Sequence, residues 1–141
     1  MTRLLKTVLA GVLIASLGGC AAAEPQALDL TWTEPSADEA VTTSIDFGTV
    51  TCEEFNGSRT IESDETQSYP EERAVFRATT IGKVTAVSLL LEGGYIFVSS
   101  EPFTITSDGV TFDEQPGHVS RNSGSEKMID TEARLSGTVD C

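Results

Sequence analysis

Residues 83–100, KVTAVSLLLEGGYIFVSS, consist of two apolar runs separated by Glu92-Gly93-Gly94. Within each run, apolar side chains recur at every second position, which is the period of a β-strand. A helix over residues 84–91 is the alternative, but the β-branched content and the glycines that follow favour a strand. The stretch therefore predicts a β-hairpin. The residues that share a face in its two arms are Val87, Leu89 and Leu91, then Tyr95 and Phe97.

Turn-forming pairs predict a further hairpin on each side of this one. Asn56-Gly57 is a favoured two-residue turn, and residues 58–61 return from it. Asp108-Gly109 separates two short alternating runs that carry aromatic and β-branched residues. Each pair therefore marks a place where the chain reverses into a neighbouring antiparallel strand.

The remaining pattern is also typical of strands. Gly48 interrupts the alternation between residues 45–47 and 50–52, and a glycine at such a change of phase predicts a β-bulge. Residues 73–80 predict a strand, and the last strand carries Leu135, Val139 and Cys141 on one side. Short strands and frequent turns, without an amphipathic helix, predict an all-β fold: a small antiparallel β-sandwich or partly closed barrel with one disulfide.

The first 19 residues have the features of an export signal. Arg3 and Lys6 precede a short apolar run that is too short to span a bilayer. The run ends in Leu17-Gly18-Gly19-Cys20, which resembles the lipobox of bacterial lipoproteins. That resemblance implies a lipoprotein signal peptide over residues 1–19 and a diacylglyceryl group on the thiol of Cys20. A plain secretory signal with an incidental cysteine is the alternative.

The chain after the signal divides by composition into two parts. Residues 20–41 combine alanine, proline and acidic residues, so we expect the lipidated cysteine to be followed by an acidic tether. An edge strand over residues 28–33 is the alternative, because Leu28, Leu30 and Trp32 alternate with polar residues. Residues 42–141 are expected to form a β-rich extracytoplasmic domain, lipid-anchored to the cell membrane or cell envelope.

Lipidation of Cys20 leaves two cysteines, Cys52 and Cys141. Exported proteins encounter conditions that permit disulfides, and a small domain gains from a covalent link. We therefore expect a disulfide between these two residues. Two free thiols or part of a metal site are the alternatives, although a metal site would require more histidine or cysteine at close spacing.

The formal net charge of −13 excludes several classes of partner. Nucleic acids and anionic headgroups require basic patches that this composition does not supply. His118 is the only histidine, no motif marks a serine or cysteine nucleophile beside it, and we expect it in a surface loop. We expect no catalysis, no cofactor and no metal.

Several carboxylates are close together in the sequence, and we expect them to form a solvated acidic surface. A calcium site is the alternative, because Ca²⁺ prefers several oxygen ligands. The residues are Glu53, Glu54, Glu62, Asp64, Glu65, Asp113 and Glu114.

Four short motifs are similar to those of the mycobacterial 19 kDa lipoprotein antigen family of actinobacterial surface lipoproteins. They are Leu17-Gly18-Gly19-Cys20, VTC at residues 50–52, VTAVSL at residues 84–89 and GTVDC at residues 137–141. The resemblance spans most of the domain. It implies a cell-envelope antigen with a paired cysteine bridge, immunomodulatory or adhesive at the host interface, without an established catalytic activity.

Two functions agree with these features. In the first, a membrane-anchored lipoprotein displays a binding or antigenic module that contacts a protein partner. In the second, the fold encloses a cavity and carries a lipid or another hydrophobic ligand within the envelope. The apolar residues on both faces of residues 88–98 suggest the second function, but a pair of strands buried on both sides explains them equally well.

Overall fold

The computed structural model describes residues 24–64, 74–122 and 126–141, and these residues form one antiparallel sheet of ten strands. One helical turn, η1 (Glu92–Gly94), occurs within the described ranges. The strands are β1 (Gln26–Trp32), β2 (Val41–Gly48), β3 (Val50–Phe55), β4 (Ser58–Ser63), β5 (Val75–Ile81), β6 (Val84–Leu90), β7 (Tyr95–Ser99), β8 (Ile105–Thr106), β9 (Gly109–Asn122) and β10 (Glu126–Asp140).

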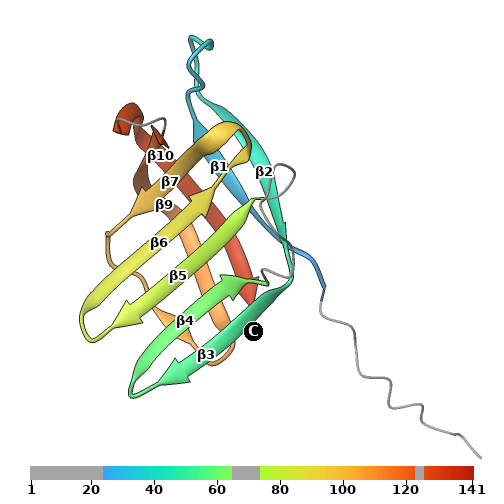
Figure 1. Ribbon diagram of the computed structural model, residues 1–141, viewed down its shortest axis with the longest axis vertical. Helices are drawn as coiled ribbons and strands as arrows, with labels where there is room; N and C mark the ends of the chain where they lie inside the picture. Colours follow the sequence, from blue (N-terminus) through green and yellow to red (C-terminus); the bar gives the residue numbers. More distant parts are fainter. Residues whose placement is uncertain (1–23, 65–73, 123–125) are drawn as a thin grey trace, which may run out of the picture.

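The sheet curls into a nearly closed barrel, which confirms the predicted all-β fold (Figure 1). Its strand order is β2-β1-β10-β9-β7-β6-β5-β4-β3, and β8 pairs with β9. The two edge strands, β2 and β3, are consecutive in the chain and are separated by Thr49 alone. Gly48 ends β2 with a φ of 75°, a conformation that glycine adopts at little cost. The β-bulge predicted at this glycine has its counterpart in the β1–β2 pairing. Gln26 pairs with Gly48 and Ala27 pairs with Asp46, so the register shifts by one residue there.

All three predicted hairpins are present. Asn56 and Gly57 both have positive φ, as a type I′ turn requires, and join β3 to β4. Residues 83–100 form β6, η1 and β7, so the helical alternative for residues 84–91 is wrong. Asp108 connects β8 to β9 through the third turn, and Ile105 pairs with Val110 across it.

The structure corrects the predicted boundary between tether and domain. Residues 26–32, assigned to the acidic tether over residues 20–41, form β1 between β2 and β10. Their alternation directs Leu28, Leu30 and Trp32 into the core, where at most 6% of each is exposed. The alternative of an edge strand over residues 28–33 was therefore right that a strand forms there. It was wrong that this strand lies at the edge of the sheet, because β2 is the edge strand. A strand paired on both sides satisfies its backbone donors and acceptors and also buries its apolar face.

One hydrophobic core fills the described interior of the sheet. An aromatic series crosses it: the ring of Phe76 lies 4.7 Å from that of Phe47 and 6.3 Å from that of Phe112. These three residues come from β5, β2 and β9, so the contacts join strands that are far apart in the sheet order. Direct packing across the interior therefore holds the curled sheet in shape.

The core is tightly filled where β7 meets β9. A Cβ added to Gly117 would lie 2.5 Å from two ring atoms of Phe97 and 2.6 Å from the carbonyl oxygen of Val98. Because such distances are shorter than van der Waals contact, glycine is required for the observed approach of strand and ring. The sequence does not distinguish this glycine from those in the turns.

Candidate binding surface

The outer face of β5, β6 and β7 carries two cross-strand rows. In the first row Val75 pairs with Leu90, and Leu90 pairs with Ile96. In the second row Ser88 lies between Arg77 and Val98. Side chains alternate along a strand, and the intervening residues Phe76, Leu89 and Phe97 are fully buried. The row residues therefore point away from the core.

These outward apolar side chains are half-buried rather than covered. Val75, Leu90, Ile96 and Val98 are all of intermediate exposure, and Arg77 is the one charged residue in the two rows. The sheet thus presents a mainly apolar strip of four side chains to the outside, in a chain of net charge −13. An apolar outer face with a polar border is a common feature of protein contact sites. We call these four residues the apolar strip.

His118 borders the strip and corrects a prediction. It lies within β9 and pairs with Val98 of β7, and it is half-buried. The predicted surface loop at this position is therefore wrong, because β9 continues through Pro116 and Gly117 up to Asn122. The proline is accommodated where β9 pairs with β10, opposite Arg134.

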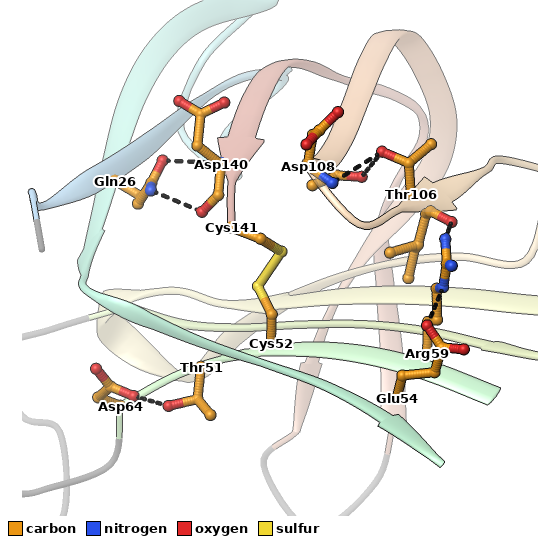
Figure 2. Close-up of a disulfide and its surroundings, with 12 residues drawn as sticks. Gln26, Thr51, Cys52, Glu54, Arg59, Asp64, Thr106, Asp108, Asp140 and Cys141 are labelled. Atoms are coloured by element: carbon orange, nitrogen blue, oxygen red, sulfur yellow. Dashed lines mark hydrogen bonds and ion pairs between the residues drawn. A yellow bond between two sulfur atoms is a disulfide. The ribbon is translucent and has the colours of Figure 1, made fainter. Parts of the chain in front are cut away.

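The predicted disulfide is present at one end of the barrel. The Cα atoms of Cys52 and Cys141 are 5.9 Å apart, and the bond joins β3 to the residue that follows β10 (Figure 2). The side-chain amide of Gln26 donates to the carbonyl of Asp140 at 3.0 Å, and the amide of Cys141 donates to the carbonyl of Asp108. The bridge thus fixes the start of β1, the end of β10 and the β8–β9 turn beside β3. Cys20 and the signal over residues 1–19 lie outside the described residues.

A surface depression of about 200 Å³ lies beside the disulfide. Its cation, Arg59, donates to the carboxylate of Glu54 at 2.9 Å and to the carbonyl of Ile105 at 3.0 Å (Figure 2). These two hydrogen bonds use the guanidinium to hold β4 against β8. We therefore interpret the depression as a structural contact between strands rather than as an anion-binding site. Its lining residues are Cys52, Glu53, Glu54, Arg59, Thr60, Ile61, Ile105, Thr106, Ser107 and Cys141.

The predicted carboxylate clusters are distributed over the surface. Glu54 pairs with Arg59, and Glu62 lies 3.7 Å from the guanidinium of Arg77. Asp64 accepts from the hydroxyls of Thr49 and Thr51, and these hydrogen bonds lower the pKa of its carboxyl. Within the described ranges, no three residues of His, Cys, Asp and Glu type are grouped closely enough to hold a metal ion. Glu65 lies outside those ranges.

The apolar strip was only partly visible in the sequence. Consecutive apolar residues at 89–91 and 95–98 indicate that both faces of these strands are apolar, but they do not distinguish a contact surface from a second buried layer.

No helix among the described residues is long and apolar enough to cross a bilayer. No protein-family model matches the chain, and it matches neither a curated protein nor a solved structure.

Proposed function

We propose that the chain is a cell-envelope lipoprotein whose barrel domain is a binding module without catalysis. The apolar strip on β5, β6 and β7 is the observation that carries this proposal. Leu90, Ile96 and Val98 gain little for the fold by pointing outward, whereas a protein partner that covers them removes their surface from water. The strip is therefore the contact site of the module, with Arg77 at its border.

Packing supports binding at the outer surface over transport inside the barrel. A carrier needs room for a ligand, and the close approach of Gly117 to the ring of Phe97 leaves none at that level of the core. Fully buried side chains from well-separated strands also fill the interior, such as Leu30 of β1 and Leu89 of β6. A barrel of this size filled by its own side chains holds its ligand outside.

The lipobox motif at Cys20 supports the membrane anchor. Acyl chains on that cysteine would hold the domain at the outer face of the membrane or elsewhere in the cell envelope. The acidic composition supports a protein rather than a nucleic acid as the partner. The antigenic, host-facing role implied by the family resemblance remains part of the same proposal.

Site-specific photo-crosslinking in cells tests the contact site. A crosslinking residue in place of Ser88, which lies between Arg77 and Val98, is expected to give a discrete higher-mass product. The matched control is the same residue in place of Ser44, which is exposed on β2 and is expected to give none. Adding Val98→Asp to the Ser88 variant should abolish the product. Equal products from positions 88 and 44 would contradict a site on the apolar strip.

Fractionation of cells tests the anchor separately. Cys20→Ser is expected to move the protein out of the membrane fraction or to leave its signal uncleaved. A double Cys52→Ser, Cys141→Ser variant is the control, because it removes sulfur from the disulfide but keeps the lipobox. Membrane association of the Cys20→Ser variant at the wild-type level, with normal processing, would rule out the lipid anchor.

A further inference from the structure

Three exposed apolar side chains lie at the tips of two neighbouring hairpins, away from the apolar strip. Phe55 ends β3, while Ile81 and Val84 face each other across the β5–β6 turn. They are 76%, 59% and 69% exposed, which makes them among the most exposed large apolar residues described. We call Phe55, Ile81 and Val84 the hairpin rim.

The register of the sheet places the rim residues in one row. Phe55 pairs with Ser58, and the next residue of β4, Arg59, pairs with Thr80 of β5. Ser58 is therefore level with Ile81, so one row crosses β3, β4, β5 and β6. Figure 1 shows both turns at the lower end of the barrel. The rim residues thus share one row at the tips of the two hairpins, with Ser58 between Phe55 and Ile81.

The rim lies at the end of the barrel where β1 begins. Gln26 pairs with Gly48, and β3 continues from that point for a further five residues past Val50. Gln26 also bonds to Asp140, next to the disulfide that fixes Cys52 (Figure 2). From Cys52 to Phe55 the strand advances about 10 Å, at about 3.3 Å per residue. The rim therefore extends past the entry point of β1.

The chain between Cys20 and that entry point is short. Six residue steps separate Cys20 from Gln26. Even fully extended, they span at most about 22 Å, at about 3.3–3.6 Å per residue. If Cys20 carries the acyl chains, the start of β1 lies within that distance of the bilayer. The corrected boundary at residue 26 is essential here, because a tether running to residue 41 would leave the domain free to move away.

We propose that the hairpin rim contacts the lipid bilayer and orients the barrel on it, a proposal that rests on the lipid anchor of the proposed function. Phe55, Ile81 and Val84 would enter the boundary between headgroups and acyl chains, as amphipathic surface segments do. Lys83 lies in the same turn as Ile81 and Val84 and is exposed. A lysine can place its stem among apolar groups and its ammonium among phosphates, which offsets locally the acidic character of the chain.

Fluorescence quenching in vesicles tests this contact. The full chain, processed and lipidated in its host, is purified as Phe55→Trp and as Val41→Trp and inserted into zwitterionic phosphatidylcholine vesicles with or without brominated acyl chains. Val41 is the matched control, since it is 44% exposed and pairs with Trp32 at the opposite end of β1. Trp32 is buried, and its emission is accounted for by comparing each protein in brominated vesicles with the same protein in unbrominated ones.

The tryptophan at position 55 is expected to lose roughly half of its emission in brominated vesicles, because such segments insert about 5–10 Å into the boundary. The tryptophan at position 41 is expected to lose none. Equal emission from the Phe55→Trp protein in both kinds of vesicle, while the protein floats with them, overturns the contact and leaves the anchor intact. Failure of the protein to float with the vesicles overturns the anchor and, with it, the contact.

Discussion

Two walls of the barrel have similar inner faces and very different outer faces. On β1 and β10, Leu30 and Leu135 pair toward the core with no exposed surface, while Thr31 and Arg134 pair toward solvent. On β6 and β7, Leu89 and Phe97 are equally buried, but the outer face carries Leu90 with Ile96. The first wall alternates between apolar and polar residues over residues 28–32 of β1 and 133–136 of β10, whereas β6 and β7 carry apolar residues on both faces.

The difference between the two outer faces shows which apolar residues the fold requires. A barrel wall needs one apolar face, and on the first wall hydroxyl pairs such as Thr31 with Thr42, 2.7 Å apart, complete the outer face. Since the polar wall is as well buried inside as the apolar one, outward apolar residues are not needed to hold a strand in this sheet. Their presence on β6 and β7 therefore favours contact with a partner.

Truncation of the inner faces should give the largest effects, of similar size on the two walls. Phe97→Ala is expected to lower the free energy of unfolding by about 3–5 kcal/mol, and Leu30→Ala by about 2–5 kcal/mol, because each leaves a cavity in a filled core. Denaturant titration of the purified domain measures both. A loss below about 1 kcal/mol for either variant would mean that its wall is loosely packed, and the comparison of walls would fail.

Loss of the disulfide should come next, because it links β3 to the end of β10 on the polar wall. Replacing both Cys52 and Cys141 with Ala is expected to lower the free energy of unfolding by about 2–5 kcal/mol, since the bridge closes a long loop in the unfolded chain. The two residues are 89 positions apart in the sequence. Denaturant titration of the double variant, compared with the disulfide-bonded wild-type protein, measures the loss. Unchanged stability would show that core packing alone closes the barrel.

Substitutions on the outer faces should affect stability much less. Leu90→Thr is expected to cost about 0.2–1 kcal/mol, because it weakens cross-strand contacts with Val75 and Ile96. The control on the polar wall, Thr42→Val, should stay within about 0.5 kcal/mol of wild type. Thermal unfolding of both variants checks this. A loss for Leu90→Thr as large as that for Leu30→Ala would assign the apolar strip to the fold and weaken the proposed binding role.

The smallest effect concerns the corner where the two edge strands meet. Hydrogen bonds from Thr49 and Thr51 lower the pKa of Asp64, so its carboxylate stabilises the folded state above the unfolded pKa, about 4. This contribution is lost as pH falls through the lower pKa of the folded state. Asp64→Asn should therefore differ from wild type at neutral pH and converge with it in acid. Melting temperatures from pH 7 to pH 2 test this, and a difference that grows in acid would contradict it.

Much of the fold could be predicted from local patterns. The alternation in residues 83–100 and the turn pairs Asn56-Gly57 and Asp108-Gly109 predict strands and reversals, because they depend on backbone conformations of neighbouring residues. The disulfide between Cys52 and Cys141 was predicted from the number of cysteines and the expectation of export rather than from geometry. The candidate site was harder to predict from the sequence, because apolar residues on both faces of β6 and β7 agree equally with burial and with a contact surface.

The strand periods, the hairpin turns and the pairing of cysteines were thus derivable from the order of residues alone. The membership of β1 in the sheet was not, because a short strand with many polar residues becomes stable only when β2 and β10 supply its hydrogen bonds and its core contacts. The near closure of the barrel, the requirement for Gly117 against Phe97, and the alignment of the hairpin rim all depend on contacts between distant residues. Such contacts exist only after the chain is folded, since sequence periodicity sets the direction of a side chain but not its neighbour across the sheet.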